Sequence, residues 1–293
     1  MKSGFVSIIG RPNVGKSTLI NALVGRKVSI ITPKPQTTRL AIQGVMHHDD
    51  MQVVFVDTPG IHKPRQKLGE AMNRMAYASL RDIDVILLVV DAGEPYGPGD
   101  AYLIDKIKNL KNIIVIFNKI DTTNIKLVTT LKETYKRQLP DAPHIEISAI
   151  RMANLEDIVA ALKERLPEGP AYFPPDVYTN FPEAFNIGET VREKIMLLTK
   201  QELPHVVAVQ IEKITDQGPM RFVQATIIVE KDSQKGIIIG QGGQMIKKIG
   251  TWARHDLENE YGRHFHLELF VRVEAEWRDS LLRLKEFGFT NGN

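Results

Sequence analysis

Gly10-Arg11-Pro12-Asn13-Val14-Gly15-Lys16-Ser17 is the stretch that decides the fold of the first part of this 293-residue chain. It fits the pattern G-x-x-x-x-G-K-[S/T] of loops whose backbone N–H groups surround phosphates. Residues 5–9 before it are apolar or β-branched and predict a buried strand, and residues 17–23 after it predict a helix. This order directs N–H groups and the positive end of the helix at an anion. The stretch therefore predicts a nucleotide site in an α/β domain.

The side chains of this loop have distinct expected roles. In the pattern, Lys16 reaches the β- and γ-phosphates and the Ser17 hydroxyl is a ligand of Mg²⁺. The residues expected to contact the nucleotide here are Gly10, Asn13, Val14, Gly15, Lys16, Ser17 and Thr18. A glycine-rich turn that binds nothing is the alternative, and the Lys-Ser pair between a strand and a helix argues against it.

The composition limits the class of protein. The chain has 43% hydrophobic and 25% charged residues and a net charge of +3, as in an ordinary globular protein. It has no cysteine, which excludes disulfides and thiolate metal sites. We find no run of about 18 apolar residues that predicts a membrane span, and no secretory signal is expected. We therefore expect a cytoplasmic protein, and the sequence leaves peripheral contact with the inner membrane open.

Apolar runs alternate with amphipathic stretches from the loop to about residue 166. The predicted strands lie at 53–56, 85–90, 113–117 and 145–147, and the predicted helices lie near 67–80, 99–109, 124–138 and 154–165. Buried strands that alternate with helices predict right-handed crossovers and a mainly parallel sheet. Since such sheets bind ligands at the carboxyl ends of their strands, the residues at these ends are the candidates for a site.

The strand at 53–56 is followed by Asp57-Thr58-Pro59-Gly60. The Asp57 carboxylate can reach the ligand shell of Mg²⁺ through water, and the Gly60 N–H can contact a γ-phosphate because glycine has no Cβ. The four residues alone would equally fit a plain turn. Together with the phosphate loop they predict a segment that responds to the γ-phosphate.

The strand at 113–117 is followed by Asn118-Lys119-Ile120-Asp121, which suits guanine. Guanine presents two adjacent donors, N1–H and the 2-amino group, and the Asp121 carboxylate can accept both. Adenine has no such pair, and charge-assisted hydrogen bonds contribute about 1.5–3 kcal/mol each, so adenine would be rejected. We expect Asn118 to contact the other edge of the base and the stem of Lys119 to cover its face.

Ser148-Ala149 follows the last predicted strand and offers a backbone N–H for guanine O6. Four such segments in this order, each at a strand end, resemble the translation-factor-type GTPases, the class that includes Ras. The resemblance implies hydrolysis of GTP to GDP and phosphate with Mg²⁺ as cofactor. The residues with implied catalytic roles are Lys16, Thr38, Gly60 and Asn13, and the implied Mg²⁺ ligands are Ser17, Thr38 and Asp57.

The chain departs from Ras-like enzymes at Ile61, where those enzymes place a glutamine that orients water. Isoleucine cannot hydrogen-bond water, so we expect slow intrinsic hydrolysis. Thr37-Thr38-Arg39 is the expected first switch, with Thr38 as the ligand of Mg²⁺ and the γ-phosphate and Thr37 as the alternative. In related GTPases without the glutamine, an asparagine at the position of Asn13 helps to hold K⁺, so the resemblance leaves a K⁺ ion open here.

Residues 167–183 contain five prolines and four aromatic residues without helical or strand periodicity. This composition predicts a stiff, extended connector whose rings pack on one of the domains. We therefore predict a GTPase domain at 1–170, a linker at 171–183 and a second domain at 184–293.

The second domain is predicted to have the element order α-β-β-α-α-β-α. A short apolar helix and a long helix flank Gly240-Gln241-Gly242-Gly243, and this arrangement resembles a KH domain of the bacterial, type II order. The GXXG turn of KH domains clamps about four unpaired nucleotides. The implied RNA-binding residues are Lys235, Ile239, Gly240, Gln241, Gly242, Gly243, Lys247 and Lys248. A helix–helix turn without a ligand is the alternative. Trp252, Trp277 and Phe287 are expected in the core.

A GTPase domain, a proline-rich linker and a carboxyl-terminal KH domain together resemble the Era family of GTPases over nearly the whole chain. The segments 35–39 and 57–64 carry the same resemblance. It implies binding to the 3′ region of 16S rRNA, a role in assembly of the small (30S) ribosomal subunit, and a monomer. The residues alone give a guanine-nucleotide switch joined to a reader of single-stranded RNA. Two alternatives stay open: a tRNA- or stress-linked GTP sensor whose KH domain binds protein, and a non-enzymatic GTP-gated RNA scaffold.

Overall fold

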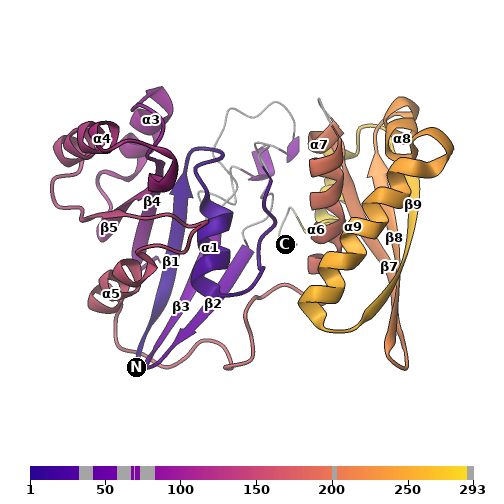
Figure 1. The fold of residues 1–293 in the computed structure, drawn as a ribbon, viewed down its shortest axis with the longest axis horizontal. Helices are drawn as coiled ribbons and strands as arrows, with labels where there is room; N and C mark the ends of the chain where they lie inside the picture. Colours follow the sequence, from indigo (N-terminus) through magenta and orange to yellow (C-terminus); the bar gives the residue numbers. More distant parts are fainter. Residues whose placement is uncertain (33–41, 58–66, 69, 73–82, 200–202, 289–293) are drawn as a thin grey trace. The chain divides into compact units, whose positions relative to one another are not determined.

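The computed structural model describes residues 1–32, 42–57, 67–68, 70–72, 83–199 and 203–288 (Figure 1). The described residues divide into two compact units, built mainly from residues 1–180 and 181–288. Within these ranges, no helix is both long enough and apolar enough to cross a membrane.

The first unit is an α/β domain. Its elements are β1 (Lys2–Gly10), α1 (Lys16–Val24), β2 (Ile42–His48), β3 (Met51–Asp57), β4 (Val85–Asp91), α3 (Pro98–Ile107), β5 (Ile113–Asn118), a 3-10 turn η1 (Ile120–Thr122), α4 (Ile125–Gln138), β6 (His144–Glu146) and α5 (Leu155–Arg165). The strands form one sheet in the order β2-β3-β1-β4-β5-β6. Among the described strands of this sheet, only β2 and β3 pair antiparallel, which confirms the predicted mainly parallel sheet.

Helices cover both faces of this sheet because its strands carry apolar side chains on both sides. α1 and α5 pack on one face, in a core that includes Phe55 of β3 and Ile158 of α5. α3 and α4 pack on the other face, where Phe117 of β5 meets Leu131 and Tyr135 of α4. The carboxyl ends of the parallel strands β1, β3, β4, β5 and β6 therefore lie at one edge of the sheet, and the candidate site residues follow them.

The proline-rich segment after α5 lies against the first unit. Gln52 Oε1 accepts hydrogen bonds from the backbone N–H groups of Tyr172 and Phe173, at 2.6 and 3.0 Å. Gln52 Nε2 donates to the Phe173 carbonyl at 2.8 Å, and the Tyr172 ring packs on Phe5 with centroids 4.7 Å apart. A ring of the segment thus packs on a domain, as expected. The boundaries 1–170, 171–183 and 184–293 stay a prediction.

The second unit has the predicted order α-β-β-α-α-β-α, with a further four-residue helix and two 3-10 turns. Its elements are α6 (Glu183–Leu198), α7 (Leu203–Val206), β7 (Ala208–Gln217), β8 (Met220–Val229), α8 (Asp232–Ile239), η2 (Gln241–Gly243), α9 (Gln244–Tyr261), β9 (His264–Val273), η3 (Trp277–Asp279) and α10 (Leu281–Glu286). In the sheet β7-β8-β9, β7 pairs antiparallel and β9 parallel with β8.

The first helix of this unit is shorter than the sequence predicts. The pattern of residues 184–203 predicts one helix that Pro204 ends, but α6 ends at Leu198. The backbone of Thr199 is extended, and its hydroxyl donates to the Ile195 carbonyl at 2.6 Å. A β-branched residue with a hydroxyl that bonds the preceding turn thus ends the helix five residues before the proline.

The core of the second unit lies between the sheet and the helices α6, α8 and α9. Trp277 is buried, and its Nε1 donates to the Val206 carbonyl at 2.9 Å, so its expected core position is confirmed. The expectation for Trp252 is wrong, because 42% of this residue is exposed. The buried stripe of α9 is made by Ile249, Ala253 and Leu257, at intervals of four residues, and Trp252 lies beside it.

Candidate functional site

The loop between β1 and α1 has backbone conformations that favour glycine. Gly15, the N-cap of α1, has φ 97°, and a Cβ there would lie 2.3 Å from Asn118 Nδ2. Asn13 also has a positive φ, 65°. The N-cap Gly15 makes no side-chain hydrogen bond to the first turn of α1, and the N–H groups at a helix N-terminus are suited to binding an anion. The loop therefore fits a phosphate, and a side chain at Gly15 would collide with Asn118.

Lys16 begins α1 and is buried beneath its own loop. Its Nζ donates to the carbonyls of Gly10 at 2.9 Å and Arg11 at 2.8 Å. Hydrogen bonds between an ammonium and an anionic oxygen are stronger than those to neutral carbonyls. We therefore expect Lys16 to exchange these carbonyls for phosphate oxygens when a nucleotide binds.

Asn118, the last residue of β5, is buried and connects three segments of the site. Its Nδ2 donates to the Val14 carbonyl at 2.9 Å, and its Oδ1 accepts from the N–H groups of Lys119 at 2.8 Å and Ala149 at 3.0 Å. The structure thus gives Asn118 a connecting role, and its predicted contact with the base stays a prediction. The Ala149 N–H predicted for guanine O6 is one of these donors, so O6 would share it with Asn118.

Lys119 has an ammonium held from two sides. Its Nζ lies 2.7 Å from the Asn13 carbonyl and 2.6 Å from Asp91 Oδ2. These contacts fix the aliphatic stem, which is the part predicted to cover the base. Sequence analysis missed Asp91, although it ends the neighbouring strand β4 and the strand-end rule could have found it.

Asp121 lies on the turn η1 and keeps its charge. Its Oδ1 accepts from the Ser148 hydroxyl at 2.6 Å, and its Oδ2 accepts from Arg151 Nε at 3.4 Å. The hydrogen bond from Ser148, with a smaller contribution from Arg151, holds the pKa of the Asp121 carboxyl below its usual value. The carboxylate is therefore ionised at neutral pH, as an acceptor for two guanine donors must be. Arg151 was missed by sequence analysis.

The predicted Mg²⁺ ligands are described in part. Ser17 is the second residue of α1, and Asp57 is the last residue of β3, paired in register with Ile8 of β1. Both therefore belong to the edge of the sheet at which the phosphate loop begins. Hydroxyl and carboxylate oxygens are the ligands that Mg²⁺ prefers, so this donor set fits the ion. The predicted residues Thr37, Thr38, Gly60 and Ile61 lie outside the described residues.

In the second unit, α8 and α9 are joined by Gly240-Gln241-Gly242-Gly243. A Cβ on Gly240 would lie 2.7 Å from Met245 Cβ, so packing requires glycine here. Gly242 and Gly243 have φ 57° and 78°, and a Cβ on either would meet no atom within 4 Å. The backbone at these two positions is therefore open, as needed for close approach of a phosphate.

The predicted RNA-binding side chains surround this turn. Lys247 and Lys248 are exposed in the first turns of α9, and Lys235 and Ile239 are half-buried on α8. Lys248 Nζ lies 5.0 Å from the centre of the Trp252 ring. Cations near an open glycine backbone attract a polyanion, although the chain as a whole has little net charge.

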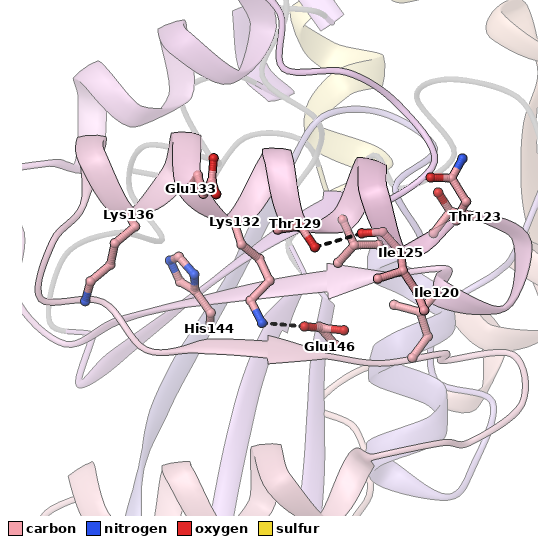
Figure 2. A pocket seen from close by; sticks show the side chains of 11 residues that line it. Ile120, Thr123, Ile125, Thr129, Lys132, Glu133, Lys136, His144 and Glu146 are labelled. Carbon is pink, nitrogen blue, oxygen red and sulfur yellow. Dashed lines mark hydrogen bonds and ion pairs between the residues drawn. The ribbon is translucent and has the colours of Figure 1, made fainter.

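A separate pocket of about 570 Å³ lies between α4 and β6 (Figure 2). Lys132 of α4 and Glu146 of β6 form an ion pair of 2.5 Å across it. Burial lowers the pKa of His144 in its lining, and the nearby Lys132 and Lys136 add to this, so the imidazole is neutral at neutral pH. None of the predicted nucleotide or RNA ligands lines this pocket.

Two family models match this chain, one mainly in the first structural unit and one in the second. Residues 5–119 match the family model described as 50S ribosome-binding GTPase, and residues 202–278 match the model described as KH domain. A protein named GTPase Era from Lacticaseibacillus paracasei is 48% identical over 289 residues, which cover 98% of this chain and 96% of that protein.

Two solved structures are similar over nearly the whole chain. A variant of Aquifex aeolicus Era bound to GDP and AlF4⁻ matches with a TM-score of 0.95 and 40% identity, covering 99% of this chain and 100% of that chain. A crystal structure of Era in complex with MgGDPNP and nucleotides 1506–1542 of 16S ribosomal RNA matches with the same TM-score, identity and coverage.

Proposed function

The chain belongs to the Era family of GTPases, and on this premise we propose that it is a GTP-hydrolysing switch that binds the 3′ region of 16S rRNA and assists assembly of the 30S subunit. The observation that carries the proposal is the presence, in one chain, of an ionised Asp121 at a phosphate-loop site and an open GXXG backbone at Gly242 and Gly243. We also propose that the protein acts as a monomer in the cytoplasm and that it makes peripheral contact with the inner membrane.

The small subunit is the proposed partner, although one matching family model is described as 50S ribosome-binding. That model matches only residues 5–119, and it leaves out the KH domain. The relative that is bound to 16S rRNA nucleotides covers 99% of this chain at 40% identity. The match that includes the RNA-binding part of the chain therefore decides the choice.

Binding of GTP is proposed to begin with an exchange of partners at Lys16. Its ammonium leaves the carbonyls of Gly10 and Arg11 and takes phosphate oxygens, while the first N–H groups of α1 surround the phosphates. The proposed Mg²⁺ ligands are Ser17 with Thr38 and Asp57. When bound, Mg²⁺ neutralises charge that develops on the phosphates.

Selection of guanine is proposed to depend on Asp121, which accepts from N1–H and the 2-amino group. Ser148 orients this carboxylate from one side at 2.6 Å, and it stays charged because its pKa is lowered. Lys119, held by Asp91 and the Asn13 carbonyl, covers the base. A base without the two donors would leave the carboxylate unpaired, which is the physical basis of the discrimination.

Hydrolysis is proposed to be slow without a partner, since Ile61 cannot orient water. We propose that the exposed Asn13 helps to hold a K⁺ ion beside the phosphates, where a cation would stabilise developing charge. Hydrolysis should then be faster in K⁺ than in Na⁺ at equal ionic strength, and Asn13→Ala should remove the difference. Equal rates in both salts for the unaltered chain would end the K⁺ part of the proposal.

The experiment for the proposed function uses the full chain with Lys16→Ala as its matched control. We expect the unaltered chain to release phosphate from GTP slowly, to do so faster with an oligonucleotide of the 16S rRNA 3′ end, and to bind that oligonucleotide more tightly than a shuffled one. The control should release no phosphate. Binding of GTP without release under any condition would favour the non-enzymatic scaffold, and equal binding of both oligonucleotides would contradict the 16S assignment.

A further inference from the structure

The phosphate loop has a second attachment, made by Arg11 to the beginning of α3. Arg11 Nη1 lies 3.1 Å from Asp100 Oδ2, and its Nη2 lies 2.9 Å from Glu94 Oε2. One guanidinium thus bridges two carboxylates in the same domain. Neither carboxylate belongs to the sequence motifs for phosphate, magnesium or guanine.

The two carboxylates differ in how firmly they are held. The Asp100 side chain is 7% exposed, and its Oδ2 also accepts from the Gly97 N–H at 2.9 Å, which fixes it in the first turn of α3. The Glu94 side chain is 54% exposed. Solvent screens exposed pairs, so the contact with Asp100 is the one expected to matter. If Arg11 were removed, the buried Asp100 carboxylate would lose this cationic partner.

The Arg11 side chain packs closely against α3 at Gly99. A Cβ on Gly99 would be 3.3 Å from both Cδ and Nε of Arg11 and 3.4 Å from its Cγ. The backbone of Gly99 has no positive φ that would itself require glycine. The absence of a side chain at this position therefore leaves room for the guanidinium to reach Asp100.

Arg11 also contacts the catalytic lysine, because its backbone carbonyl accepts from Lys16 Nζ at 2.8 Å. When Lys16 turns to phosphate oxygens, this hydrogen bond is given up, and the guanidinium contacts with α3 remain. From this geometry we propose that Arg11 is a positioning residue that holds the phosphate loop on α3 and slows release of bound guanine nucleotide. The inference rests on the proposed function of the loop as a GTP and GDP site.

The test measures release of fluorescently labelled GDP from the full chain after excess unlabelled GDP is added. Loss of a charge-assisted contact should speed release about 5- to 20-fold in Arg11→Ala and in Asp100→Asn. The double variant should be no faster than either single variant, because both remove the same contact. Arg11→Lys should lie between, since an ammonium keeps the charge but lacks the planar donor fork of the guanidinium. Glu94→Gln should change release less than about twofold.

Two further variants separate positioning from simple stabilisation. Gly99→Ala should displace Arg11 and speed release, although alanine favours the helix and should not lower the thermal unfolding midpoint. Lys163→Gln removes the exposed ion pair with Asp50, which is 2.7 Å long, and should leave release unchanged. If Arg11 only stabilises the domain, Arg11→Ala will lower the unfolding midpoint and release GDP within twofold of the unaltered chain, which overturns the inference.

The test also distinguishes failure of the inference from failure of the proposed function. If the unaltered chain does not bind labelled GDP, the proposed nucleotide site is wrong. If it binds and the variants release at the unaltered rate, the nucleotide site stands and the role of Arg11 is refuted.

Discussion

Asn118 Nδ2 donates a hydrogen bond of 2.9 Å to the carbonyl of Val14 and so joins the end of β5 to the phosphate loop. Its Oδ1 accepts from the N–H groups of Lys119 and Ala149, so one buried carboxamide fixes the positions of three loops. This relationship separates two functions that the sequence motif combines. Asn118 aligns the loops, and we propose that Asp121 reads the base.

Asn118→Ala is therefore expected to weaken binding of all purine nucleoside diphosphates by a similar factor. Each buried partner left unpaired costs about 1–3 kcal/mol, which corresponds to roughly 5- to 150-fold in affinity. Calorimetric titration with GDP and 7-deaza-GDP, which lacks the N7 acceptor on the base edge opposite Asp121, measures both the loss and the ratio of the two affinities. An unchanged ratio supports the aligning role. A loss confined to GDP would show that Asn118 reads the base directly.

Asp121→Asn is expected to change the choice of base. The amide would present a donor to one of the two guanine donors, whereas xanthine offers an oxygen at the 2-position and pairs with it. We expect weaker GTP binding and a preference shifted toward XTP, by at least about 10-fold in the affinity ratio. The matched control is Asn118→Ala, which should leave this ratio unchanged. GTP binding as tight as in the unaltered chain would refute the assignment of Asp121.

Much of this arrangement could be predicted from the sequence, because it depends on local patterns. Residue type and spacing are enough to predict three features: the glycines of the phosphate loop, the polar residues at strand ends and the GXXG turn. Each of them depends on the local conformation of the backbone. The partners of charged side chains are different. Asp91 beside Lys119, Asp100 beside Arg11 and Arg151 beside Asp121 are set by which strands and helices become neighbours.

The error at Trp252 has the same origin. A large aromatic residue on an amphipathic helix is usually part of its buried face, but the face of α9 is set by Ile249, Ala253 and Leu257. Neighbouring positions on a helix differ by about 100°, so Trp252 falls at the margin of that stripe. The roles of Thr38, Gly60 and Ile61 stay predictions, since these residues lie outside the described part of the chain.

Discrimination between GDP and IDP is expected to be constant from pH 8 to about pH 5, because IDP lacks only the 2-amino donor to Asp121. Hydrogen bonding from Ser148 lowers the pKa of this carboxyl below 3.8, so the charged form is present above that value and is lost as pH falls through the lowered pKa. Ser148→Ala should raise this pKa and move the loss of discrimination to higher pH. Competition binding compares GDP and IDP at the same pH. Because titration of their phosphates affects both affinities equally, it does not change the ratio of the two. A GDP-to-IDP ratio that changes between pH 8 and 5 in the unaltered chain would contradict the charged state of Asp121.

Gly242→Asp is expected to abolish single-strand RNA binding while GTP affinity is unchanged. The backbone here is open, with no atom within 4 Å of a Cβ position, so the new carboxylate would lie where a phosphate must approach. Gly242→Asn is the matched control, because it has nearly the same shape and no charge. Filter binding should show at least about a 10-fold difference between the two variants. RNA affinity unchanged in both would refute the clamp.

Above all, we propose that this one chain couples its guanine-nucleotide state to recognition of the 16S rRNA 3′ end. The most direct measurement is photo-crosslinking of the full chain to total cellular RNA, with a non-hydrolysable GTP analogue or with GDP, followed by sequencing of the bound RNA. We predict crosslinks concentrated at the 3′ end of 16S rRNA and stronger with the GTP analogue. Crosslinks on tRNA or on large-subunit rRNA, or an equal pattern in the two nucleotide states, would contradict the account.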